Sequence, residues 1–126
     1  MTAITLTTAD ARVVSDIRDQ WTAEAAVAIL PGQVIQLNAA GKWILAKATT
    51  APLSTGCYVA LRSAGVGQGL TGMSRGYFGG LDTELAINAA VYLSDTDGGI
   101  DTAAGTVSVV IGRIVKAGIM HVNCPV

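Results

Sequence analysis

The sequence predicts an all-β protein: a small β-sandwich or barrel of short antiparallel strands with an N-terminal arm or short helix. The residues are 51% hydrophobic but only 5% aromatic, so the core must be built from aliphatic side chains. Fifteen glycines divide the chain into short extended runs. After residue 24, no segment keeps a helical periodicity long enough to connect two parallel strands. Short strands separated by frequent turn signals are typical of sandwiches and barrels.

The length of 126 residues fits one domain, which we divide into an N-terminal arm at 1–24 and a β domain at 25–126. Charged residues make up 13% of the chain, against about 25% in ordinary soluble domains. Because a monomer normally covers its surface with charge, either Thr, Ser, Gly and Ala form much of this surface or further copies or a partner cover part of it, and we favour the second. The eight basic residues are scattered, which excludes the clustered positive surface that nucleic-acid binding needs.

The N-terminal part leaves two readings open. Residues 2–7 alternate apolar and polar side chains, which indicates an extended strand. In 9–21, Val13, Ile17 and Trp21 recur every four residues, as they would on one face of a helix. The β-branched pair at 13–14 favours an extended arm instead, so both a short helix and an arm remain possible there.

From residue 25 onward the chain reads as strand, turn, strand. The pair Pro31-Gly32 marks a turn, and residues 38–41 form a hairpin loop in which Gly41 suits a positive φ. Glycines 72 and 76 are expected to break one of the strands. The expected strands are 25–30, 33–37, 42–46, 56–61, 70–78, 89–93, 106–115 and 118–123.

Targeting and redox signals are sparse. Met1 leads into a segment with neither a basic nor a long apolar region, so we expect no secretory signal. The longest apolar run, 25–30, is far shorter than the roughly twenty residues that span a bilayer. We therefore expect a soluble chain made in the cytosol, without a membrane partner. In that compartment Cys57 and Cys124 are expected to be free thiols that act as small buried hydrophobic residues.

The most tempting catalytic motif is Gly-Met-Ser-Arg-Gly at 72–76, which fits G-x-S-x-G around Ser74. Aspartates of the loop 95–101 and the single histidine, His121, follow in the order of the α/β-hydrolase triad. That motif works only where a strand turns tightly into a helix, and the next residues, 77–81, begin no helix. We interpret it as a chance match.

The remaining motifs are weaker still. The glycine-rich segment 65–69 lacks the helix and the acidic residue of a dinucleotide site. The aspartates of 95–101 lack the terminal glutamate of a calcium loop, and His121 with Cys124 makes only two ligands of a zinc site. We therefore predict no enzyme activity, no cofactor, no metal and no small-molecule substrate.

Three stretches together resemble the capsid cement (head decoration) proteins of tailed bacteriophages. They are AVAILPGQVIQLNAAGKWILA at 26–46, LRSAGVGQGLTGMSRGYFGG at 61–80, and AINAAVYLSDTDGGIDTAAGTVSVVIGRIVKAGIMHVN at 86–123. The family pattern is matched further by GCYVAL at 56–61. The resemblance leaves out the first 24 residues and is a pattern of turns and strands.

The resemblance implies a non-enzymatic homotrimer in the virion, on the capsid exterior, where it binds the major capsid protein and bridges capsomers of the expanded head. An extended Thr/Ile/Leu segment can add to a sheet edge of a partner, so we expect the N-terminal arm to bind the capsid. Deleting residues 1–8 should then weaken capsid binding without unfolding the domain. The expected capsid-binding residues are Thr2, Ile4, Thr5, Leu6 and Thr7.

Two alternatives share the same composition. One is a phage tail or head-fibre structural module, which is also strand-rich and rich in Thr, Ala and Gly. The other is a ligand-binding or carbohydrate-binding module, for which Trp21, Trp43 and Tyr77 are the available stacking residues.

Overall fold

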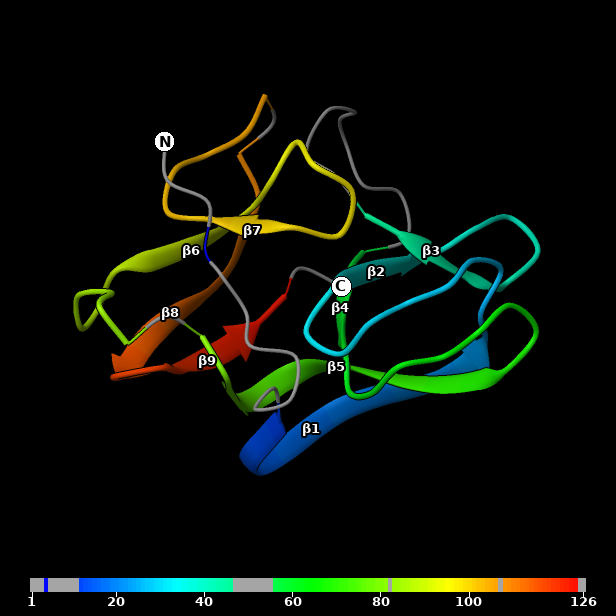
Figure 1. Ribbon diagram of the computed structural model, residues 1–126, viewed down its shortest axis with the longest axis horizontal. Coiled ribbons are helices and arrows are strands. Elements are labelled where there is room, and N and C mark those ends of the chain that lie inside the picture. Colours follow the sequence, from blue (N-terminus) through cyan, green and yellow to red (C-terminus); the bar gives the residue numbers. More distant parts are fainter. Residues whose placement is uncertain (1–3, 5–11, 47–55, 82, 107, 125–126) are drawn as a thin grey trace.

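The computed structural model describes residues 4, 12–46, 56–81, 83–106 and 108–124, with the backbone alone for 12–19. The described residues form one antiparallel sheet that curls into half a barrel and contain no helix, which confirms the predicted all-β class (Figure 1). The strands are β1 Arg12–Glu24, β2 Val34–Leu37, β3 Trp43–Leu45, β4 Tyr58–Ala60, β5 Gly69–Gly79, β6 Ala90–Leu93, β7 Ile100–Asp101, β8 Val110–Lys116 and β9 Ile119–Asn123.

Strand β5 is a central strand of the sheet and is paired along both of its edges. Strand β1 pairs with it along its whole length, from Arg12 opposite Gly79 to Glu24 opposite Gly69. The other edge of β5 therefore takes two strands end to end: β4 at residues 72–73 and β9 at residues 75–79. The order β3-β2-β4-β5-β9-β8-β6-β7 follows, and β5 joins a β2–β4 half to a β6–β9 half (Figure 1).

Two separate hydrophobic cores fill the molecule. The central core lies between the two halves of the sheet, and the lobe core lies under the loops 25–33 and 61–69. The central core contains Ile4, Val34, Ala46, Cys57, Val59, Met73, Phe78, Leu81, Val91, Leu93, Ile100, Val109, Ile111, Ile114, Met120, Val122 and Cys124. The lobe core contains Ala25, Ile29, Ile35, Trp43, Ala60, Ala64 and Leu70.

The β2–β4 half is buried on both faces. Side chains alternate along a strand, so the neighbours Val34 and Ile35 point to opposite faces, and they belong to the central core and the lobe core respectively. In the lobe core, the buried Trp43 indole N–H donates to the Leu70 carbonyl at 2.8 Å. Its ring meets the Tyr58 ring edge-on at 5.2 Å between centroids. This half therefore has no open sheet face.

The β8–β9 pair is buried on one face only. Ile114 and Met120 are opposite one another and point into the central core. Their neighbours Arg113 and His121 are also cross-strand partners, and they reach the other face, where Arg113 is exposed. The outer face of this half is therefore not covered by the core, and its side chains can reach solvent.

Several predicted elements are confirmed and others differ. The segment 12–21 is extended as part of β1, so the helical reading of 9–21 is wrong there. The strand predicted at 25–30 is wrong: only Ala25 and Ile29 form isolated bridges, because this apolar run folds irregularly over the lobe core. Strand β5 runs unbroken through both glycines, and the strand predicted at 106–115 begins only at Val110.

Candidate functional site

The G-x-S-x-G motif lies in the middle of β5 and makes no turn. Ser74 is 1% exposed, and its carbonyl accepts a hydrogen bond from the Cys124 N–H at 2.8 Å. Gly72 is there for close packing, because a Cβ would lie 2.9 Å from the Tyr58 Cβ. Gly76 has a φ of 146°, in the region that favours glycine. Both glycines are therefore required by the packing and the backbone conformation of β5.

Ser74 and His121 lie on opposite faces of the sheet. Tyr77 pairs with His121 and Phe78 with Met120, without a register shift between β5 and β9. Paired residues of an antiparallel sheet point to the same face: Ser74 lies opposite Cys124, one position beyond the Arg75–Asn123 pair, and both Cys124 and Phe78 belong to the central core. Ser74 therefore shares the inner face with Phe78, and His121 shares the outer face with Tyr77. The triad order found in the sequence does not become a triad in space.

The aspartates of the loop 95–101 stabilise turns. The Asp95 carboxylate accepts hydrogen bonds from the Thr106 N–H and hydroxyl, each at 2.9 Å. The buried Asp101 carboxylate accepts one from the Ala103 N–H at 3.2 Å. Within the described residues, no group of three or more His, Cys, Asp or Glu side chains could hold a metal ion.

The glycine-rich segment 65–69 is a turn that is closed by the side chain of Gln68. The Gln68 side-chain oxygen accepts a hydrogen bond from the Gly65 N–H at 2.7 Å, and Gly67 has a φ of 86°. These are the features of a tight surface turn. In the described part of the chain, no helix follows this segment, so it does not form a phosphate-binding loop there.

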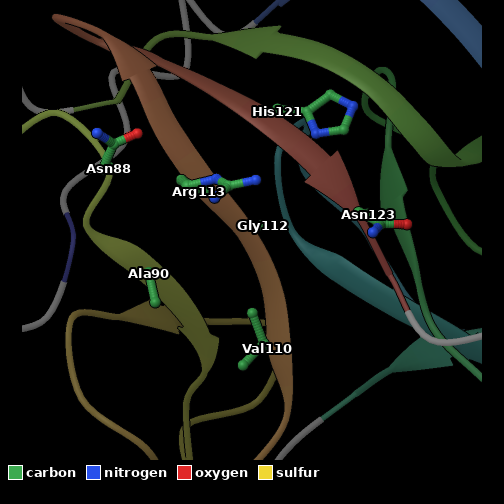
Figure 2. A pocket seen from close by; sticks show the side chains of 7 residues that line it. All are labelled: Asn88, Ala90, Val110, Gly112, Arg113, His121 and Asn123. Carbon is green, nitrogen blue, oxygen red and sulfur yellow. The ribbon is translucent and has the colours of Figure 1, made fainter.

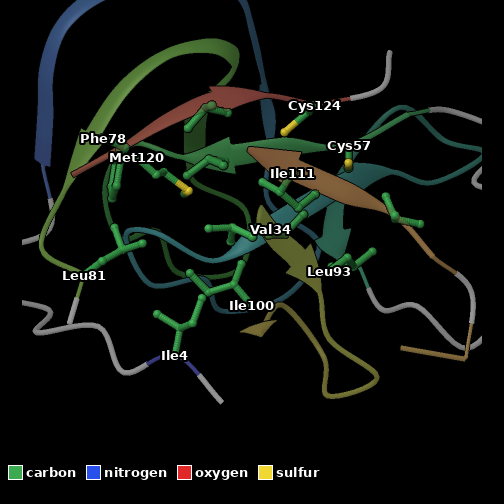
Figure 3. Close-up of a cluster of buried hydrophobic side chains, with 14 of the residues drawn as sticks. Ile4, Val34, Cys57, Phe78, Leu81, Leu93, Ile100, Ile111, Met120 and Cys124 are labelled. Atoms are coloured by element: carbon green, nitrogen blue, oxygen red, sulfur yellow. The ribbon is translucent and has the colours of Figure 1, made fainter. Parts of the chain in front are cut away.

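The two cysteines meet in the central core as free thiols, as predicted (Figure 3). Cys57 precedes β4 and Cys124 follows β9, so they lie where these two strands approach one another along β5. A hydrogen bond with Cys57, together with burial and the nearby Cys57 charge, raises the pKa of the Cys124 thiol well above its ordinary value. His121 is on the other face of β9 from Cys124, so the two do not share a metal site.

Ile4 is the described member of the predicted capsid-binding arm. Its side chain is 8% exposed and belongs to the central core, and its N–H donates to the Ile100 carbonyl at 3.2 Å (Figure 3). The other residues of the predicted arm lie outside the described residues: Thr2, Thr5, Leu6 and Thr7. Ile4 itself therefore packs into the core of its own domain.

Large apolar side chains are exposed at the end of the molecule that holds the lobe core. The loops 25–33 and 61–69 lie side by side there, because Ile29 and Ala64 exchange two backbone hydrogen bonds of 2.9 Å. We call the exposed apolar residues of this end the lobe surface; they are Trp21, Val27, Leu30 and Val66, with exposed fractions of 54%, 37%, 51% and 71%. The low charge content was the signal in the sequence for such a surface.

A cavity of about 300 Å³ opens on the outer face of the β6–β9 half (Figure 2). Strands β6, β8 and β9 and the turn before β6 supply its walls. The lining residues are Asn88, Ala90, Val110, Gly112, Arg113, His121 and Asn123. It holds one guanidinium, one imidazole and two amides, and no carboxylate lines it among the described residues. Sequence reasoning missed it, although acidic residues are missing from 102–126 while Arg113, Lys116 and His121 are present.

Two further observations limit the alternatives. Trp43 is fully buried, so of the three proposed stacking residues only Trp21 and Tyr77 reach the surface. In the part of the chain that the structure describes, no helix has the length and apolar character needed to cross a bilayer. Comparison with protein-family models and with curated proteins found no match for this chain.

Proposed function

We propose that this protein is a capsid decoration (cement) protein, which binds the major capsid protein on the outside of a phage head and bridges neighbouring capsomers as a homotrimer. Two observations support the proposal. The sequence resembles that family over 26–46, 61–80 and 86–123. The lobe surface exposes four large apolar side chains on a chain with few charges, and this observation carries the proposal because a partner that covers them would remove that apolar area from water.

Stabilisation of the expanded head by this protein would follow from mass action. A protein that binds only the expanded shell stabilises that state in proportion to its occupancy. Three copies that engage adjacent lattice sites would bind with an avidity well above the affinity of one contact. The antiparallel sheet and its two cores would supply the rigid body that such bridging needs.

The first experiment measures binding and assembly. The purified protein is mixed with expanded and with unexpanded phage heads and sedimented, and its mass in solution is measured by light scattering. We expect a trimer that sediments with expanded heads only. A stable monomer that binds neither shell would contradict the proposal. A long fibrous trimer without shell binding would favour the tail or head-fibre module.

The second experiment tests the lobe surface with matched variants. Leu30→Ser removes an apolar side chain that is 51% exposed on the lobe surface, and Ile87→Ser removes one that is 55% exposed before β6. We expect Leu30→Ser to weaken head binding or trimer formation about tenfold, equivalent to about 1.4 kcal/mol. Ile87→Ser should leave both unchanged. Equal behaviour of the two variants would remove the lobe surface from the interface.

The arm needs a test that keeps Ile4. Deleting residues 1–8 would also remove a side chain from the central core, so a loss of binding could come from unfolding. Leu6→Ser leaves Ile4 in place. If the arm binds the capsid, Leu6→Ser should weaken head sedimentation while the urea midpoint stays at the wild-type value. Wild-type binding by this variant would refute a role for Leu6.

A further inference from the structure

The cavity on the outer face is built by a row of cross-strand neighbours. Ala90 pairs with Arg113, Arg113 with His121, and His121 with Tyr77. Because paired residues of an antiparallel sheet point to the same face, these four side chains stand side by side on the outer face. The small Ala90 side chain leaves room beside Arg113. Figure 2 shows the Arg113, His121 and Asn123 side chains over the β8–β9 pair.

Fixed backbone geometry sets the floor and one wall of this cavity. Gly112 forms part of the floor, and a Cβ there would collide with the carbonyl oxygen of His121. Asn88 forms part of the wall at a φ of 70°, the one positive φ of a non-glycine residue in the described part of the chain. Its N–H donates to the Ile114 carbonyl at 2.7 Å, which holds the turn onto β8. Asparagine is one of the few non-glycine residues that adopt this left-handed conformation in turns.

The strands that line the cavity, together with the neighbouring β5, carry charge of one sign. Strands β5, β6, β8 and β9 contain no aspartate or glutamate, although the whole chain has nine acidic residues. The same strands carry Arg75, Arg113 and Lys116. No described carboxylate forms an ion pair with Arg113. An exposed guanidinium with neutral amide donors beside it is a match for a carboxylate, which takes two parallel hydrogen bonds from the guanidinium fork.

The His121 imidazole packs against the Tyr77 ring. The Tyr77 ring lies 5.0 Å from the His121 ring, at an angle of 47° between their planes. This contact fixes one side of the cavity beside Arg113. On the opposite side of the lining, Val110 is 47% exposed and offers an apolar contact. The cavity therefore combines one charged donor, neutral polar donors and an apolar rim.

We propose that this cavity binds an acidic side chain of a protein partner, with the carboxylate on the Arg113 guanidinium and the Asn88 and Asn123 amides as further donors. A free small anion in so open a cavity would keep most of its water, and surface charge pairs in water contribute little. An acidic residue within a peptide also brings contacts with the apolar rim at Val110. The proposal rests on the charge distribution of this chain and is independent of the proposed function.

The test uses blocked peptides and free acetate as probes. NMR spectra of the protein are recorded during titration with a peptide of alternating Glu and Ala, a matched peptide with Gln in place of Glu, and acetate. We expect the Glu peptide to shift the Arg113 Nε–H and the Asn88 and Asn123 amide signals saturably, and added salt to weaken the effect. The Gln peptide and acetate should cause no saturable shift. Equal binding of acetate, or equal binding of the Gln peptide, would overturn the proposal.

Matched arginine variants locate the site. Arg113→Gln should weaken binding of the Glu peptide at least tenfold, and Arg113→Lys should recover only part of it because the lysine lacks the guanidinium fork. Arg62→Gln is the control, since Arg62 is exposed in a turn outside the cavity. All three variants should keep the wild-type urea midpoint. Undiminished peptide binding by Arg113→Gln, or an equal loss in Arg62→Gln, would refute the site.

Discussion

Strands β2 and β4 differ from strands β8 and β9 in how their faces are buried. The neighbours Val34 and Ile35 in β2 are both fully buried, because a core lies on each side of that half. In β9 the buried Met120 and Val122 alternate with His121, which reaches the surface. The same aliphatic residue types therefore build a sheet that is buried on both faces in one half and a sheet that is buried on one face in the other.

This difference decides where each half can meet a partner. The β2–β4 half can offer only its loops and edges, and its exposed apolar residues Val27, Leu30 and Val66 lie on loops. The β8–β9 half can offer a sheet face, and Arg113 and the cavity lie on it. The two halves therefore offer surfaces that differ in chemistry, an apolar loop end and a polar sheet face.

The largest expected effect comes from emptying the lobe core. Trp43→Ala removes a fully buried indole and its hydrogen bond to the Leu70 carbonyl. We expect a loss of about 3–5 kcal/mol in the free energy of unfolding, measured by urea denaturation. Trp21→Ala, at a side chain that is 54% exposed, should change it by less than about 0.5 kcal/mol. Equal losses in the two variants would contradict the burial of Trp43 in the lobe core.

A smaller effect is expected where β5 passes over the lobe core. Gly72→Ala places a Cβ 2.9 Å from the Tyr58 Cβ and 3.1 Å from the Ile35 Cδ1. We expect a loss of about 1–3 kcal/mol, because overpacking forces neighbours to shift. Gly69→Ala in the same strand meets no atom within 4 Å and should be neutral or slightly stabilising. If Gly72→Ala were tolerated, β5 would be able to move away from Tyr58 and Ile35 at this point.

The smallest effect concerns the thiols between the two halves. The hydrogen bond with Cys57 and burial raise the pKa of the Cys124 thiol, so the folded state holds this proton more tightly than the unfolded chain. The contribution of Cys124 to the free energy of unfolding should therefore stay level below about pH 8.5 and decrease above it, by at most about 1.4 kcal/mol per pH unit. Cys124→Ala should make that fall shallower in urea titrations between pH 8 and 10. An unchanged slope would show that other groups cause it.

Much of this fold could be predicted from local patterns. The turn at 38–41, where Gly41 has a φ of 76°, and the strands on either side of it are as expected. The run 25–30 misled because an apolar run predicts burial but does not distinguish a strand from a loop folded over a core. Strand β7, with two residues, is too short to leave a pattern.

The cavity could not be predicted, because its walls come from segments far apart in the sequence. Asn88 and Ala90 reach Arg113 only through the pairing of β6 with β8, and that ladder contains a register shift between Val91 and Tyr92. A one-residue slip would move Arg113 to the opposite face. The residue types were visible in the sequence, but the register that brings them together is a property of the folded sheet.

The central core has a consequence for how the chain folds. Ile4 and Cys124, near the two ends of the chain, belong to the same core, so its last contacts join residues separated by almost the whole sequence. Proteins dominated by such long-range contacts fold slowly, since a large loop must close before these contacts form. During synthesis this core stays incomplete until Cys124 has left the ribosome.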